Sequence, residues 1–188
     1  MVGDGLVGII DVAGVGWYLV VPAGKEAPDL VDENIIVVRQ PASNVYVGQK
    51  DTFDMFLSID EAHIRSVVTQ AGFEDDAALT FSGSCSEVDF AQLVRSRSSL
   101  AILPGTYADG RVTGRAAGEN IRCSDLSDAD AAGLSRMFEG FNGLGIPPFV
   151  DRSADESSAQ ARSEWLRVYG ILLGCEKQAD NAFRSSVK

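Results

Sequence analysis

The chain has 188 residues, of which 45% are hydrophobic and 23% are charged, and its formal net charge at pH 7 is −11. These values are typical of a globular protein, and we expect one domain over residues 1–188. No apolar run approaches the roughly 18–20 residues that span a bilayer, and no basic segment precedes an apolar one at the N-terminus, so we expect neither a membrane span nor a cleaved signal peptide.

The first third of the chain predicts β-structure. Runs rich in Val, Ile and aromatic residues alternate with Gly, Pro, Asn and Asp, as strands alternate with turns. The expected strands are residues 6–12, 17–21, 35–40, 45–47 and 52–57, which make residues 1–57 the β-rich part. Residues 3–8 have the Gly-x-Gly-x-x-Gly spacing of dinucleotide-binding proteins, which needs a strand before it and a helix after it. Only two residues precede it here, and the run that follows it is strand-like, so it does not predict a dinucleotide site.

The rest of the chain predicts helices. Ser58 with Glu61 and Ser153 with Glu156 have the spacing of capping boxes, and Ser86 has the position of a third N-cap. The expected helices are 58–71, 86–97, a third from 124 or 127 to 139, and 153–174. We also expect a short strand at 79–81, an Arg- and Gly-rich loop at 104–122, a connector at 142–152, and a short helix or tail at the C-terminus. The sequence therefore predicts an α+β fold, with a β-rich N-terminal part followed by a mainly helical C-terminal bundle.

Five arginines stand together in an otherwise acidic chain. Residues 1–94 carry 15 acidic and 4 basic side chains, whereas residues 95–122 carry 2 acidic and 5 basic ones, all of them arginine. We call this set the arginine cluster; it consists of Arg95, Arg97, Arg111, Arg115 and Arg122. Because arginine makes forked contacts with phosphate, arginines along a loop can follow a nucleic-acid backbone or another polyanion. The alternative is that they pair with the chain's own carboxylates on the surface.

The other candidate sites are weaker. Residues 128–139 match part of a calcium-binding loop, at Asp128, Asp130 and Glu139, but the fifth position is alanine. The alternative for these acids is a favourable place in the first turn of a helix. His63 and Cys85 allow a cysteine–histidine pair, although no motif supports one. The three cysteines form no Cys-x-x-Cys pair, which argues against a disulfide scaffold and a zinc ribbon and favours a cytoplasmic setting. We expect no cofactor and no enzyme activity.

The segment around the arginine cluster resembles the coat proteins of rod-shaped helical RNA viruses. The resemblance is carried by Arg95-Ser-Arg97 at a helix end, by the long loop with further arginines, and by the helix that follows, in an acidic chain of this size. It covers about residues 86–140; the four-helix bundle of that family has no counterpart to the β-rich residues 1–57.

The resemblance implies a function. Arg95 and Arg97 would clamp RNA phosphates, Arg111 and Arg115 would lie in an inner loop, and Glu119 or Asp128 would be a carboxylate between subunits. On this basis we expect a structural subunit of a homo-oligomeric assembly, most concretely a coat or nucleocapsid protein that binds single-stranded RNA, located in the virion or the host cytoplasm. The alternatives are an accessory or scaffold subunit of a larger protein complex and, from another class, a small cysteine- or metal-dependent enzyme.

Overall fold

A computed structural model describes most of the chain, and it confirms the α+β class. The described residues are 7–29, 31–32, 34–48, 50–59, 68–69, 80–81, 88–105, 113–116, 119–122 and 137–187. Strands dominate the described N-terminal half, and the two long helices α5 (Ala159–Leu173) and α6 (Glu176–Ser186) lie near the C-terminus.

Three strands near the N-terminus form one small sheet. Strands β1 (Gly8–Val12) and β2 (Gly16–Val21) pair antiparallel, and β3 (Ile35–Arg39) joins β2 in parallel. The turn between β1 and β2 contains Gly14 at φ 72°, a left-handed conformation that favours glycine. All three strands lie where the Val- and Ile-rich runs of the sequence predict them.

A second sheet has five strands, all parallel. They are β4 (Tyr46–Val47), β5 (Val68–Thr69), β6 (Thr80–Phe81), β7 (Ala101–Pro104) and β10 (Pro148–Asp151), in the spatial order β10-β7-β4-β5-β6. The chain enters this sheet in the middle at β4, moves outward through β5 and β6, and returns to the other side of β4 for β7 and β10. The direction of strand succession therefore reverses between β4 and β7.

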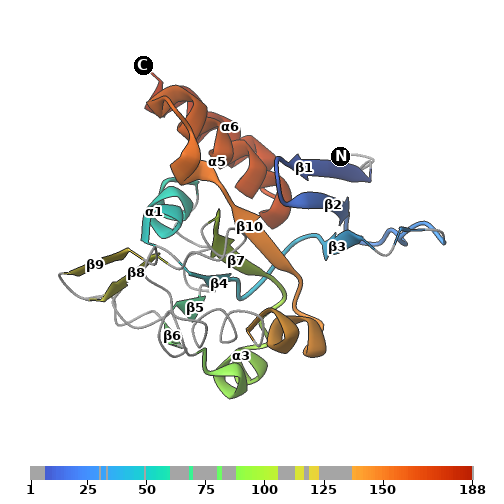
Figure 1. Cartoon of the computed structure of the whole chain (residues 1–188). Coiled ribbons are helices and arrows are strands. Elements are labelled where there is room, and N and C mark those ends of the chain that lie inside the picture. The colour runs from blue at the N-terminus through green and yellow to red at the C-terminus, as the bar shows by residue number, and fades with distance from the viewer. Residues whose placement is uncertain are drawn as a thin grey trace.

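The five-stranded sheet separates two hydrophobic cores, because successive residues of a strand point to opposite faces. The larger core joins one face to α1 (Lys50–Ile59), α5, α6 and the inner face of the three-stranded sheet, and includes Val47, Ile102, Phe149, Phe56, Tyr169, Leu172 and Tyr18. The smaller core joins the opposite face to α3 (Phe90–Ser96) and the helical residues 137–143, and contains Tyr46, Ala101, Leu103, Leu93, Met137, Phe141 and Ile146. Figure 1 shows α1, α5 and α6 on one side of the sheet and α3 on the other.

The expected strand at 52–57 is wrong, because this segment belongs to helix α1. Its aromatic residues favour a strand, but Phe53 and Phe56 are three positions apart and both are buried, with Asp54 exposed between them. Spacing by three or four places side chains on one face of a helix, whereas strand alternation would put Asp54 on the same face as Phe56. The expected helix at 58–71 agrees with the structure at residues 58–59, the last two of α1, and is wrong at residues 68–69, which form β5; the rest of it lies outside the described residues.

The cap positions of two other helices differ from expectation. Asp89, not Ser86, caps α3 by accepting a hydrogen bond from the Gln92 N–H at 2.9 Å. Helix α5 begins after Ser158, whose hydroxyl accepts from the Ala161 N–H at 3.1 Å. The expected start at Ser153 instead forms the short 3-10 helix η3 (Ser153–Asp155).

Two segments expected to be irregular contain strands. The connector 142–152 includes β10, whose four residues are all buried. The loop 104–122 includes a hairpin of β8 (Thr113–Ala116) and β9 (Glu119–Arg122). Neither segment has the alternating pattern of a half-buried strand, so periodicity alone does not reveal them.

Candidate ligand site at the carboxyl edge of the parallel sheet

The strand order singles out one place in the fold. In open parallel sheets, ligands bind outside the carboxyl ends of the strands, at the point where the strand order reverses, because the loops there leave in opposite directions and open a crevice. In this chain that point lies between β4 and β7. The residues that follow these two strands are therefore the candidate site.

Glycine follows each of the two strands. Gly48, after β4, is buried, and its N–H donates to the Ile102 carbonyl at 2.9 Å, which extends the β4–β7 ladder by one residue. Gly105, after β7, is buried as well, and a Cβ there would lie 3.0 Å from Arg152 Cγ and 3.1 Å from the Asp151 carbonyl oxygen. A side chain at position 105 would therefore displace the segment that leaves β10.

Helix α1 begins two residues after Gly48, so its N-terminus lies at the same edge. The aligned peptide dipoles of a helix place partial positive charge at this end, where backbone N–H groups point outward. Asp51 in the first turn faces away from the sheet toward α5, since its carboxylate accepts from Arg162 Nη2 at 2.6 Å.

A buried polar cluster lies beside this edge. We call it the Asp151 cluster, and it consists of Thr52, Asp151, Ser153 and Tyr169. The Thr52 hydroxyl donates to Asp151 Oδ2, and the Ser153 N–H donates to Asp151 Oδ1 at 2.7 Å. The Asp151 carboxylate thus ties the first turn of α1 to the end of β10. The Tyr169 and Ser153 hydroxyl groups lie beside it without a partner at hydrogen-bonding geometry.

The surroundings of Tyr169 keep its phenol protonated. Burial raises the pKa of Tyr169 well above its usual range, and the negative charge of Asp151 raises this pKa further. The cluster is closed to solvent, since Thr52 and Ser153 are fully buried and Asp151 is 1% exposed. It therefore acts as a rigid support for the edge rather than as a reactive site.

Arg152 crosses from β10 toward the three-stranded sheet. Its Nη1 donates to Asp155 Oδ2 at 2.9 Å, and its Nη2 lies 3.9 Å from the place that a Cβ on Gly14 would occupy. Tyr18 makes a second link, because its hydroxyl accepts from the Val150 N–H at 3.1 Å. These contacts fix the small sheet against the edge strand β10.

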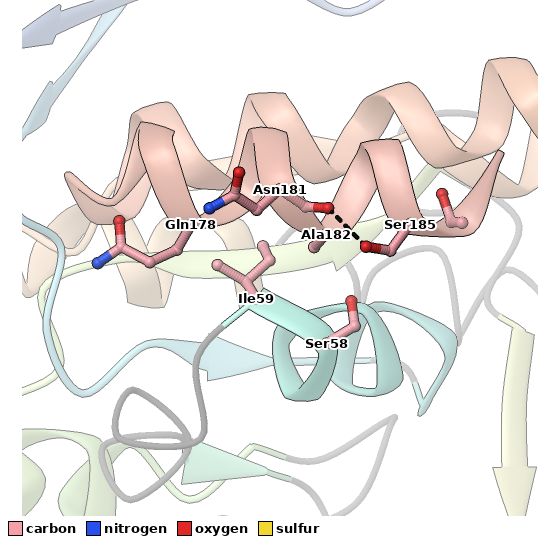
Figure 2. A pocket seen from close by; sticks show the side chains of 7 residues that line it. Ser58, Ile59, Gln178, Asn181, Ala182 and Ser185 are labelled. Carbon is pink, nitrogen blue, oxygen red and sulfur yellow. Dashed lines mark hydrogen bonds between the residues drawn. The ribbon is translucent and has the colours of Figure 1, made fainter. Parts of the chain in front are cut away.

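A surface groove lies away from the carboxyl edge of the sheet. It is an open groove of about 550 Å³ between the end of α1 and one face of α6, lined by Ser58, Ile59, Gln178, Asn181, Ala182, Ser185 and Ser186. Figure 2 shows the amide and hydroxyl groups of α6 above Ile59, with Ser185 bonded to the Asn181 carbonyl of its own helix. The described residues that line it carry amide, hydroxyl and apolar groups and no charged side chain.

The structure places the arginine cluster only in part. Arg95 lies in the last turn of α3 with its side chain 61% exposed, and it contacts Asp89 at 3.7 Å and Gln92 at 2.9 Å. Arg97 ends the same helix in the left-handed conformation, at φ 54°. Arg115 lies on β8 and Arg122 on β9, while Arg111 is outside the described residues.

Most other sequence-predicted candidates also lie outside the described residues. This holds for His63, Cys85, Asp128 and Asp130; Glu139 of the calcium-like loop is exposed on the helical residues 137–143. Within the described ranges, no group of three or more His, Cys, Asp or Glu side chains is placed to hold a metal ion. Within the same ranges, no helix is long and apolar enough to cross a membrane.

We compared the sequence with known protein families and with curated proteins. No known protein family matches the chain, and no curated protein matches its sequence. The functional argument therefore depends on the fold and the edge described above.

Proposed function

We propose that this chain binds a small polar ligand at the carboxyl edge of its five-stranded sheet, between β4 and β7. The observation that carries the proposal is the strand order, which starts at β4 and reverses between β4 and β7. Gly48 supports it, because a residue without a side chain at the end of β4 lets a ligand approach the backbone, whereas the space beside Gly105 is filled by Arg152 and Asp155.

The chemistry of the edge favours a ligand with an anionic or acceptor group. The N-terminus of α1 lies there, and helix N-termini attract carboxylates and phosphates through their N–H groups and dipole. The Asp151 cluster holds this helix end in one position. A rigid donor set of this kind suits binding, because little conformational freedom is lost when the ligand arrives.

A titration of the ¹⁵N-labelled chain tests the proposal, with inorganic phosphate and citrate as probes. We expect saturable shifts of the amide signals of Gly48, Thr52 and Gly105. Ser43 and Ser99 lie near the amino ends of β4 and β7, where Ser99 N–H donates to the Ser43 carbonyl at 3.1 Å, and their signals should stay unchanged.

Matched glycine variants make this test specific. Gly48→Val adds a branched side chain at the end of β4, directly before the N-terminus of α1, and should abolish the shifts. Gly143→Val is the control, since a Cβ at Gly143 meets nothing within 4 Å. Shifts that are absent, that do not saturate, or that are unchanged in Gly48→Val would contradict the proposal.

The second candidate is the one that the sequence favours: a coat or nucleocapsid subunit whose arginine cluster binds RNA phosphates. The observation in its favour is the high exposure of Arg95 beside Arg97; among the described residues, the acidic contact given for Arg95 is the one to Asp89 at 3.7 Å. The test is the ratio of absorbance at 260 and 280 nm of native sedimentable material, before and after ribonuclease.

An RNA-binding subunit should give a high ratio on fast-sedimenting particles, and it should lose RNA in the double variant Arg95→Ala, Arg97→Ala, with binding that weakens steeply as salt rises. Arg184→Ala is the matched control, because Arg184 is 70% exposed on α6, away from the arginine cluster. A protein-like ratio on a small species would contradict RNA binding and leave the accessory-subunit alternative.

A further inference from the structure

The outer face of the three-stranded sheet is apolar and joins neither core. Strand alternation and register place Ile10, Val12, Tyr18, Val20, Ile36 and Val38 on the inner face, and all of these belong to or pack against the larger core. The opposite face carries Ile9, Trp17, Leu19, Val21, Ile35 and Val37, none of which belongs to either core. We call these six residues, with Asp11 and Arg39, the outer face.

Two of its side chains are strongly exposed. Ile9 is 63% and Trp17 52% exposed, whereas Leu19 and Val21 are 6% and 1% exposed and are already covered within the chain. In register, Leu19 lies opposite Ile9 on β1 and opposite Val37 on β3, so it is the centre of the face. Figure 1 shows β1-β2-β3 beside α5 and α6, and the inner face packs into the larger core that these helices share. Contiguous apolar patches of this kind mark protein contacts.

Two residues of opposite charge, Asp11 and Arg39, lie at opposite corners of the outer face. Asp11 lies on β1 in the row of Trp17 and Ile35, and Arg39 lies on β3 opposite Val21, two rows away. From strand spacing and rise, the two Cα atoms are about 16 Å apart, too far for a mutual ion pair. Both side chains are exposed, and neither makes an ion pair within the described part of the chain.

The outer faces of two copies of the chain are complementary to each other in charge. A two-fold axis in the plane of the face, through Leu19 and perpendicular to the line from Asp11 to Arg39, brings Asp11 of each copy over Arg39 of the other. The same rotation superposes the apolar centres and crosses the strands at roughly 70°, closer to the orthogonal than to the aligned class of sheet packing. An isologous contact requires this reciprocity, in which residue i meets j and j meets i.

We propose that the outer face is the contact surface of a symmetric dimer of this chain, with an apolar centre at Trp17 and Leu19 and reciprocal Asp11–Arg39 pairs at two corners. The charges of Asp11 and Arg39 cancel within the face, so the face adds nothing to the repulsion that a net charge of −11 produces between whole chains. This surface is separate from the ligand edge, and the two proposals stand or fall independently.

Sedimentation velocity of the full chain over a wide concentration range tests the proposal. We expect a reversible monomer–dimer equilibrium. Asp11→Arg and Arg39→Asp should each raise the dimer dissociation constant by about tenfold or more, because each turns two attractive pairs into repulsive ones. The double variant Asp11→Arg, Arg39→Asp exchanges the charges and should restore the dimer.

Two further variants locate the apolar centre. Ile9→Lys should abolish the dimer, and Val94→Lys, at a site on α3 that is 55% exposed, is the matched control that should not. In Trp165→Phe, Trp17 is the only tryptophan, and its emission should shift to the blue as concentration rises. Far-UV circular dichroism checks that each variant is folded.

A wild-type chain that stays monomeric at every concentration would overturn the proposal, whether another protein or the chain's own residues cover the face. A dimer that persists in Ile9→Lys would overturn it too, since the contact would then lie elsewhere. A dimer lost in both charge reversals but not restored in the double variant would refute the reciprocal pairs.

Discussion

The substitution Gly170→Ala provides a sharp test of how α5 packs on α6. In an isolated helix, alanine in place of glycine is favourable by about 1 kcal/mol. In this structure, however, a Cβ at Gly170 would lie 2.4 Å from the Cβ of Ala179 and 3.3 Å from the Cα of Glu176. Carbon atoms pack at about 3.5–4.0 Å, so the two helices would have to separate locally by more than 1 Å.

The clash outweighs the propensity gain. Overpacking costs about 1–3 kcal/mol, and the upper end applies because the Ala179 methyl has no other rotamer. The net loss is therefore about 2 kcal/mol, which lowers the urea midpoint by about 1 M for a slope near 2 kcal/mol per M. An unchanged or raised midpoint in Gly170→Ala would refute the reasoning.

A double-mutant cycle isolates the contact. Ala179→Gly alone should lose about 1 kcal/mol of helix propensity. Combined with Gly170→Ala it removes the clash and exchanges the two residue types, so the double variant should be near wild-type stability. Additive losses of about 3 kcal/mol would show that the two positions do not meet.

Three further predictions concern buried groups. Gly140→Ala should destabilise by about 1–3 kcal/mol in urea unfolding, because its Cβ would lie 2.4 Å from the Phe90 ring; a neutral result would show that the ring moves aside. Asp151→Ala should lower the free energy of unfolding by about 2–4 kcal/mol, since it leaves two buried donors without an acceptor, and a loss below 1 kcal/mol would contradict the buried cluster. The raised pKa of Tyr169 means that the unfolded phenol loses its proton first, near pH 10, so stability should fall as pH rises above about 10. Tyr169→Phe should lessen that fall in urea midpoints measured from pH 8 to 11, and an unchanged profile would contradict it.

Local sequence patterns predict the three-stranded sheet, the end of α5 and the places of β4 and β6, which lie within the expected strands 45–47 and 79–81, but not β5, β7 or β10. β1, β2 and β3 are continuous Val- and Ile-rich runs, and Gly174 ends α5 in the left-handed conformation that glycine favours. β5 has only two residues, which leave little periodic signal, and no local pattern shows that the five strands are parallel. Their order depends on contacts between segments far apart in the chain, which propensity does not encode.

The candidate site residues likewise divide into those that the local sequence reveals and those that depend on contacts between distant segments. The exposed Arg95 and Arg97 stand out by composition, and their RNA-binding role stays a prediction. The Asp151 cluster has no local motif, because Asp151 meets Thr52 across 99 residues of chain. The signal available was a charged pair, Asp151-Arg152, directly after an apolar run, which is typical of the carboxyl end of a buried parallel strand.

The most direct test of the central claim is a crystal structure of the chain grown with tungstate, an oxyanion whose tungsten atom gives a strong anomalous signal. The account predicts an anomalous peak at the carboxyl edge, within hydrogen-bonding distance of the N–H groups in the first turn of α1, that disappears in Gly48→Val crystals. Peaks confined to other surfaces, such as the groove beside α6 or the exposed arginines, would contradict the claim that this edge is the ligand site.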